Sequence, residues 1–309
     1  MKLGNASAVR GMHEGPGRNL LGFGTGPSGA PSFVGALDDY TANLHATWSV
    51  ARRLLSSYTG ALIRVRESSG NTEADIGFDA DGKLDEAALA AHVGANSGFV
   101  TKVYDQCGGG RDLVQATAGS QPRIVNAGTI QRFNSGVAPA MLGVTAGGQG
   151  MATAAFTALT GTDYTAVGVQ RVATVDPGNR VGVPGGTSTA SSDAGADGWV
   201  TAYILAVTGA PTSFDGSNRA TLAAAVPYAL ALASTTRTTG HVMRTAAASN
   251  TAAFTPSAKS IQHWLVWMQS VSILASSANA EWCEGAAWTA DRDSDMAAVL
   301  AEMNTFYGL

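Results

Sequence analysis

The segment VYDQCGGGRDLVQ, residues 103–115, holds the densest group of side chains that could do chemistry. It combines two aspartates, an arginine, a cysteine and three consecutive glycines. These residue types suit a carboxylate centre, a cation-binding loop or a tight corner of the fold. Consecutive glycines permit positive φ angles and a sharp chain reversal. Asp105 and Asp112 can accept hydrogen bonds from the backbone N–H groups of such a loop, and Arg111 can pair with either carboxylate. We therefore predict a structural corner. The predicted motif comprises Tyr104, Asp105, Gln106, Gly108, Gly110, Arg111 and Asp112.

A second acidic segment, GFDADGKLDEAAL, superficially matches a calcium-binding loop. With Gly82 at position six of that template, positions one and twelve fall on Gly77 and Ala88, where carboxylates are required. We predict instead a turn at Asp81–Gly82, followed by a helix that Asp85 caps. The histidines show no paired ligand spacing, so we predict no metal site and no cofactor. His45 and His92 lie in helical patterns and are expected to be packing or surface residues.

Composition sets the class of protein. The chain has 309 residues, of which 45% are hydrophobic and only 14% charged, and its net charge is -4. No basic run suggests nucleic-acid binding. No segment approaches the roughly 20 apolar residues that cross a bilayer, and the N-terminus has no apolar signal region. Cys107 and Cys283 are far apart in the sequence, and we expect free thiols.

The chain divides into an arm and one domain. Residues 1–35 are rich in Gly and Pro and show no periodic pattern, which is typical of an extended arm. Such an arm docks on a neighbouring subunit or on its own domain, and the sequence leaves both open. Residues 36–309 are expected to form a single domain.

Patterning places elements along that domain. Apolar spacing predicts a helix over 37–55, a strand over 61–66, a helix over 85–94 and a strand over 99–105. Short strand candidates dominate after residue 120, separated by Gly, Pro, Asn, Asp and Ser, and this spacing favours an antiparallel sandwich. A closing helix with Met296, Val299, Leu300 and Met303 on one side ends at Gly308. The strand candidates are residues 122–125, 164–172, 199–207, 241–245, 263–274 and 281–288, and the tracts 136–162 and 185–198 are expected to be loops.

Several motifs resemble one family. They are LLSSYTGALIRVRESS (54–69), DIGF (75–78), YDQ-x-G-x-G-x-D (104–112) and QPRIV (121–125). Together they are similar to the catalytic domain of fungal and bacterial α-L-arabinofuranosidase B. The resemblance implies a mainly β, concanavalin A-like antiparallel sandwich, or jelly roll, with a few short helices and here an extended N-terminal arm. Versions of this domain also occur in bacteriophage tail fibres, spikes and other virion proteins.

The resemblance does not carry over the catalytic acids. In that family the nucleophile is a glutamate of the central β region, and the acid/base is an aspartate shortly before the strand equivalent to EWCEG. This chain has no glutamate between Glu86 and Glu281, and the stretch VSILASSANA before Glu281 has no aspartate. Glu281 and Glu284, three apart on a strand, are expected on opposite faces. The central aspartates stand beside turn-forming residues, where Asp commonly stabilises a turn. They are Asp163, Asp176, Asp193, Asp197 and Asp215.

These observations lead to the expectation of a non-enzymatic bacteriophage virion protein, located in the virion after synthesis in the host cytoplasm. Its partners would be other virion proteins held through the arm, further copies of itself (a trimer is one option) and a host glycan, with no nucleic acid and no membrane insertion. Weak candidates for glycan contacts are Trp199, Asp215, Trp282 and Trp288. For the tryptophans core packing is favoured, because each alternates with small residues on a predicted strand. The alternative functions are a glycoside hydrolase acting on host surface polysaccharide and a capsid-decorating protein without a ligand.

Overall fold

The computed structural model describes most of the chain from Phe33 onwards. The described residues are 33–143, 148–161, 163–172, 185–187, 200–204, 211–214, 219–222, 228–237, 240–253, 259–270, 273–274 and 280–309. The predicted arm therefore lies outside them except for residues 33–35.

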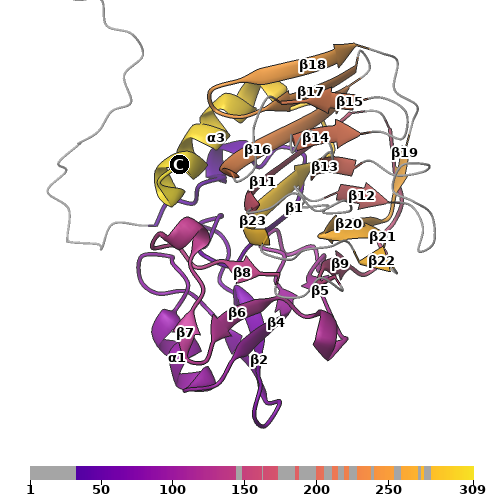
Figure 1. The fold of residues 1–309 in the computed structure, drawn as a ribbon. Helices are drawn as coiled ribbons and strands as arrows, with labels where there is room; N and C mark the ends of the chain where they lie inside the picture. Colours follow the sequence, from indigo (N-terminus) through magenta and orange to yellow (C-terminus); the bar gives the residue numbers. More distant parts are fainter. Residues whose placement is uncertain are drawn as a thin grey trace, which may run out of the picture. The chain divides into compact units, whose positions relative to one another are not determined.

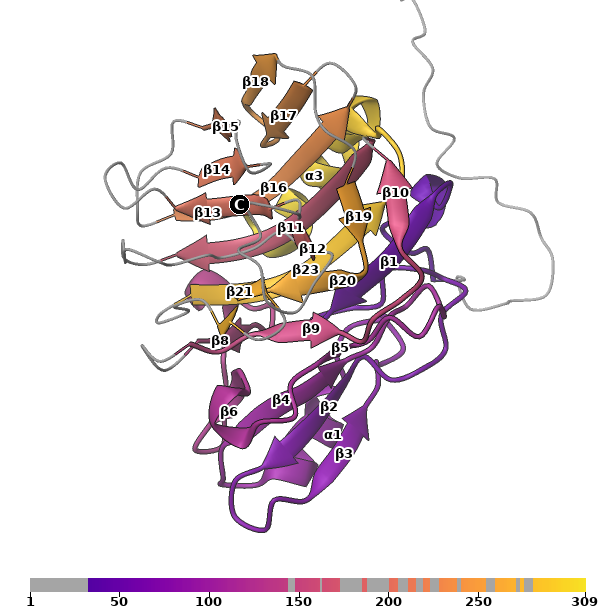
Figure 2. The same cartoon turned by 90° about the vertical axis from the view of Figure 1, so that its right-hand side faces the viewer.

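Antiparallel β-structure dominates the described residues (Figures 1 and 2). The main sheet follows the hydrogen-bonded order β12-β20-β9-β5-β4-β6-β8-β23-β11-β16-β17-β18, with β1 paired to β23, β2 paired to β3 and β4, and β7 paired to β6. Its strands are β1 (Leu44–Ser49), β2 (Ile63–Glu67), β3 (Glu73–Ile76), β4 (Gly98–Val103), β5 (Leu113–Val114), β6 (Arg123–Asn126), β7 (Thr129–Ile130), β8 (Met141–Leu142), β9 (Met151–Thr153), β11 (Tyr164–Val172), β12 (Gly185–Thr187), β16 (Tyr228–Arg237), β17 (Gly240–Arg244), β18 (Ser249–Ala253), β20 (His263–Val266) and β23 (Ala280–Trp288).

Smaller sheets and helices complete these elements. The small sheets pair β10 (Leu159–Gly161) with β19 (Lys259–Ile261), β13 (Val200–Ile204) with β14 (Pro211–Phe214) and β15 (Arg219–Thr221), and β21 (Met268–Ser270) with β22 (Ile273–Leu274). The helices are α1 (Glu86–Val93), α3 (Asp293–Tyr307) and the short 3-10 turns η1 (Asp38–Tyr40), η2 (Ala118–Ser120) and η3 (Phe133–Ser135). None of the described helices combines the length and the apolar character needed to span a bilayer.

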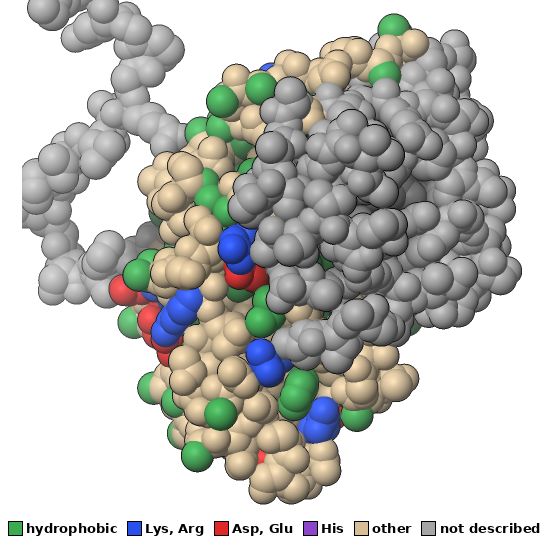
Figure 3. Space-filling view, viewed as in Figure 1, with side chains coloured by type: hydrophobic (Ala, Val, Ile, Leu, Met, Phe, Trp, Pro, Cys, Tyr) green, Lys and Arg blue, Asp and Glu red, His purple; other side chains and the backbone are tan. Residues whose placement is uncertain are grey.

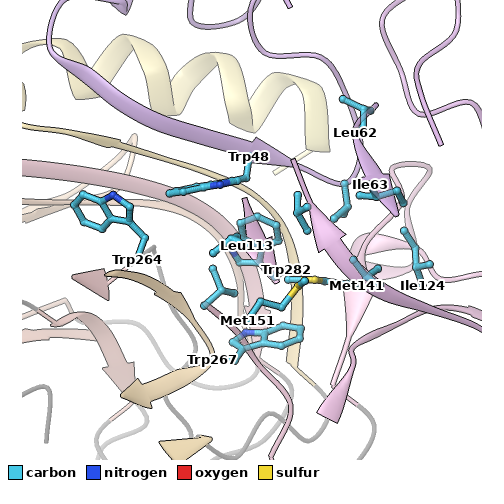
Figure 4. Packing of buried hydrophobic residues seen from close by; sticks show 14 of the residues in the cluster. Trp48, Leu62, Ile63, Leu113, Ile124, Met141, Met151, Trp264, Trp267 and Trp282 are labelled. Carbon is cyan, nitrogen blue, oxygen red and sulfur yellow. The ribbon is translucent and has the colours of Figure 1, made fainter. Parts of the chain in front are cut away.

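Two hydrophobic cores hold the fold together. The first joins strands from both ends of the sheet path: Trp48 of β1 and Trp282 of β23 pack in one cluster with Leu113 of β5, Met151 of β9 and Trp264 of β20 (Figure 4). The second lies between the other face of β11, β16 and β23 and the helix α3, whose Met296, Val299, Leu300, Met303 and Tyr307 are buried. The sheet thus encloses an apolar interior, and the prediction of a concanavalin A-like antiparallel sandwich is confirmed.

Most predicted elements are present. The strand at 164–172 matches β11, and the helix at 85–94 matches α1, where Asp85 accepts a hydrogen bond from the Ala88 N–H group at 2.9 Å. Helix α3 ends at Gly308, which has φ of 69°. The tract 136–162, expected to be a loop, instead contributes β8, β9 and β10.

The predicted helix over 37–55 is wrong. Only η1 and the strand β1 form there, and His45 lies on the strand. Antiparallel pairing with β23, from Leu44 opposite Trp288 to Ser49 opposite Glu284, outweighs the helical spacing of the apolar residues.

Charged residues are sparse and mostly paired. Basic and acidic side chains lie in small separate groups among neutral ones on the face shown in Figure 3. One group is centred on the buried pair Arg52 and Glu284. Arg52 donates to Glu284 at 2.7 and 2.9 Å and to the partly exposed Glu302 at 2.6 and 2.9 Å, and the Tyr307 hydroxyl donates to Glu284 at 2.8 Å. This network ties α3 to β23 and to the segment after β1.

The interior also contains polar atoms without hydrogen-bond partners. Gln170 of β11 is fully buried opposite Trp282 of β23, which places both side chains on the inner face of the sheet. Neither amide atom of Gln170 nor the Trp282 Nε1 atom has a partner in the part of the chain that the structure describes. Each such group costs free energy of folding because it loses its hydrogen bonds to water.

Replacement of Gln170 by leucine is therefore expected to raise the free energy of unfolding by about 1 kcal/mol. Gln106 is the matched control, because it is equally buried but its amide accepts from the Leu54 N–H group at 2.6 Å and donates to the Arg52 carbonyl at 3.1 Å. Gln106→Leu should lower the free energy of unfolding by roughly 2 kcal/mol. Urea denaturation at pH 7 measures both values; equal losses in the two variants would contradict the prediction.

Candidate functional site

The 103–115 segment forms a closed loop around the carboxylate of Asp105. That carboxylate is buried, and it accepts hydrogen bonds from four backbone N–H groups at 3.0–3.3 Å. The donors belong to Thr47 of β1 and to Cys107, Gly109 and Arg111 of the loop itself. Gly108 and Gly110 have φ of 73° and 68°, in the region that glycine adopts most readily. The hydrogen bonds to Asp105 thus stabilise the loop internally and connect it to β1.

The other motif residues extend this framework. The Gln106 N–H group donates to the Thr47 carbonyl at 2.8 Å, and Asp112 accepts from the Asp105 N–H group at 2.9 Å. On the outer side, the Tyr104 hydroxyl donates to Asp75 at 2.7 Å, and burial raises the pKa of Tyr104 to about 12. Cys107 is a free thiol whose pKa is raised by burial, so it stays protonated. Cys283 is also free and buried.

His45 lies beside this loop, at a β-bulge. Leu44 and Ala46 pair with consecutive residues of β23, Trp288 and Ala287, so His45 is the extra residue of β1. Bulges redirect side chains and are frequent near functional sites. The Trp264 Nε1–H group donates to Nδ1 of His45 at 3.0 Å. Because an indole nitrogen only donates, Nδ1 must be the acceptor, and the proton of the neutral ring lies on Nε2.

Arg111 and Phe156 complete a polar and aromatic cluster around His45. The Phe156 ring centroid lies 5.0 Å from the His45 ring and 5.9 Å from the Arg111 guanidinium carbon. Arg111 donates from Nη1 to the His45 carbonyl at 3.1 Å, and a side chain at Gly109 would collide with that nitrogen. His45, Arg111 and Phe156 are half-buried. We call these three residues, with Trp264, the edge cluster.

The candidate carboxylates of β23 are engaged elsewhere. Glu281 and Glu284, expected on opposite faces, lie on the same face because a bulge at Cys283 adds one residue between them. That face is the one covered by α3 and η3. Glu281 accepts from Arg171 and from the Asn134 N–H group, both at 2.7 Å, and Glu284 is bound to Arg52. Both are thus held by arginines and are buried.

Two of the four candidate glycan contacts lie in the hydrophobic interior. Trp282 and Trp288 are fully buried, and Trp288 donates from Nε1 to the Tyr40 carbonyl at 2.7 Å. Their burial rules them out as ligand contacts and agrees with the favoured expectation of core packing: each indole fills a core between packed elements. Trp199 and Asp215 lie outside the described residues, as do Asp176, Asp193 and Asp197. Among the described residues, no group of His, Cys, Asp and Glu side chains could hold a metal ion.

Patterning alone missed the edge cluster, because His45 was assigned to a helix. No sequence motif marks His45, Phe156 and Trp264 as neighbours, because they come from β1, the segment between β9 and β10, and β20, which meet only in the folded sheet.

Replacement of Asp105 by asparagine should lower the free energy of unfolding by about 3 kcal/mol, because the new amide NH₂ group faces backbone donors. Asp79→Asn is the control: Asp79 also accepts two backbone N–H groups, from Asp81 and Lys83, but it is exposed. Its expected cost is below about 1 kcal/mol. Thermal and urea unfolding measure both; a small loss at Asp105 would contradict a central structural role.

The stability of the protein should depend on pH through His45. Burial and the nearby positive charge of Arg111 lower the pKa of His45 from 6.5 to about 4. Between these values the unfolded state binds the proton and the folded state does not, so the free energy of unfolding falls as the pH falls from 6.5 to 4. His45→Gln should flatten this part of the profile. Urea denaturation at pH 7, 5.5 and 4.5 measures the difference, and parallel profiles would contradict the prediction.

Comparison with known proteins adds a family resemblance to this geometry. Residues 39–188 match the family model described as alpha-L-arabinofuranosidase B, catalytic. The chain is 39% identical over 75 residues to alpha-L-arabinofuranosidase B of Aspergillus oryzae, covering 24% of this chain and 15% of that protein. It is 32% identical over 105 residues to the probable enzyme of Aspergillus fumigatus, covering 33% and 21%. The matched segments thus span about a fifth or less of these relatives.

Solved structures support the same fold. An arabinofuranosidase complexed with arabinofuranosyl-α-1,2-xylobiose superposes with a TM-score of 0.65 and 17% identity, over 89% of this chain and 65% of that one. A family 54 α-L-arabinofuranosidase soaked with a cyclic sulfate inhibitor gives the same TM-score and identity. At this identity the likeness concerns the fold.

These matches correct the functional expectations. The expectation of a non-enzymatic virion protein is wrong, because the matched family and the matched relatives are arabinofuranosidases. The expected virion location is likewise wrong, since the matched relatives are fungal enzymes. Over residues 39–188 the chain resembles the catalytic domain of α-L-arabinofuranosidase B, and its fold is that of the solved arabinofuranosidases.

Proposed function

We propose that this protein is a glycoside hydrolase that removes arabinofuranosyl groups from a glycan. The match of residues 39–188 to a catalytic-domain family carries the proposal. That segment includes the Asp105 loop, the bulged strand β1 and Arg52, which means that the resemblance covers the framework of the candidate site. The proposed substrate class follows from the named activities of the matched enzymes.

The reaction requires two carboxyl groups. In a retaining mechanism one carboxylate attacks the anomeric carbon while the other carboxylic acid protonates the departing glycosidic oxygen; water then attacks the glycosyl–enzyme bond with the second group acting as base. Glu281 and Glu284 do not fit these roles, because arginines and packed elements surround them. Since no glutamate lies between residues 86 and 281, the proposal assigns both roles to aspartates of the intervening segment.

Hydrolysis of 4-nitrophenyl α-L-arabinofuranoside and of an arabinofuranosyl-xylobiose tests the proposal. We expect release of 4-nitrophenol and of arabinose above the uncatalysed rate. Asp→Asn replacements at positions 163, 176, 193, 197 and 215 should include one or two that lower kcat about 100-fold or more, with unchanged unfolding midpoints. Asp79→Asn is the control. Asp79 lies on an exposed turn and is distant in sequence from these five aspartates, so the variant should retain full activity.

Two results would argue against hydrolase activity. A folded protein that binds these glycosides without cleaving them, or one whose turnover survives every aspartate replacement, would contradict the hydrolase assignment.

A further inference from the structure

The edge cluster contains hydrogen-bond donors without acceptors. His45 carries its proton on Nε2, because Nδ1 accepts from Trp264, and Nε2 has no partner among the described residues. The Nε–H group of Arg111 also has no partner there, but it is buried, so a ligand would reach Arg111 at the accessible end of its guanidinium, where the side chain is 27% exposed. Both donors flank Phe156, whose ring lies 5.0 Å from the His45 ring and 5.9 Å from the Arg111 guanidinium. A ligand that binds beside these donors would therefore need hydrogen-bond acceptor atoms.

The charge of Arg111 is also incompletely matched. Among the residues that the structure describes, the nearest carboxylate is that of Asp105, which lies 3.9 Å from Nη1 and already accepts four backbone hydrogen bonds. Asp112 is paired with Lys102 at 3.2 Å. A positive charge in a half-buried position with weak pairing attracts an anionic group, and a guanidinium binds a carboxylate through two parallel hydrogen bonds.

The aromatic side chains restrict the kind of anion. Phe156 is half-buried, and its ring lies 6.2 Å from Trp264 with the two planes inclined by 32°. Aromatic rings beside polar donors suit the C–H faces of a sugar ring together with its polar substituents. A carboxylate attached to a sugar ring satisfies both features, whereas a free inorganic anion satisfies only the charge.

We propose that His45, Arg111 and Phe156 form a subsite for the carboxylate of a uronic acid, so that the protein acts on acidic glycans. The carboxylate accepts from Arg111 and from His45 Nε2–H, and the sugar ring lies against Phe156. The β-bulge of β1 directs the imidazole to this place, and Trp264 selects its tautomer. This inference names a substrate class for the proposed hydrolase and rests on that proposal only for the glycan nature of the ligand.

The test is isothermal titration calorimetry at pH 7 with a galacturonic acid trisaccharide and with the neutral galactose trisaccharide of the same linkage. We expect the acidic ligand to bind at least about tenfold more tightly, and its affinity to fall as salt is added. Phe156→Leu, which removes the contact with the sugar ring, should weaken both ligands. Arg111→Gln should weaken the acidic ligand about tenfold or more and leave the neutral one unchanged. His45→Asn, which keeps an acceptor for Trp264 but loses the Nε2–H donor, should do the same.

Arg64→Gln is the matched control, because Arg64 is an exposed arginine that Asp75 already pairs at 2.7 Å. It should leave both affinities unchanged, and circular dichroism confirms the fold of each variant. Equal affinity for the two trisaccharides, unchanged affinity in the three variants, or competition by inorganic phosphate at the same concentration as galacturonate would overturn the inference. Cleavage of neutral arabinofuranosides without uronate selectivity would remove this subsite and leave the hydrolase standing; uronate binding without cleavage would do the reverse.

Discussion

The structure around the candidate site depends on one buried carboxylate. Asp105 accepts four backbone N–H groups, three from its own loop and one from Thr47 of β1. A carboxylate can satisfy so many donors from one point, and in doing so it fixes the loop, the first strand and the backbone of Arg111 together. The Gln106 amide hydrogen-bonds the same loop to the segment after β1. These hydrogen bonds fix the position of the edge cluster.

Two β-bulges then decide which side chains meet. The bulge in β1 makes His45 an extra residue at the sandwich edge, where it meets Trp264 of β20 and Phe156. The bulge in β23 brings Glu281 and Glu284 to the face covered by α3, where arginines neutralise both. One bulge thus places both glutamates on the face packed against α3, and the other supplies a histidine at the edge.

The family resemblance concerns the scaffold of the proposed enzyme, whereas the acidic residues present in the chain limit which side chains could catalyse the reaction. The match to a catalytic domain covers the scaffold, namely the Asp105 loop and β1 with Arg52. The intervening chain supplies aspartates and no glutamate. The proposed hydrolase would form its acid pair from aspartates, whose shorter side chains need closer backbone positions to reach the same substrate atoms.

The sequence alone determined the sandwich class, the strand β11, the capped helix α1, the closing helix α3 and the turn-forming character of the 103–115 segment. These features rest on local patterns: alternation, capping residues and glycines at tight turns. It did not determine that residues 44–49 form a strand or that Glu281 and Glu284 share a face. Only tertiary structure decided these points, because strand pairing between segments more than 230 residues apart outweighs local helical spacing, and because a bulge changes the face of every residue beyond it.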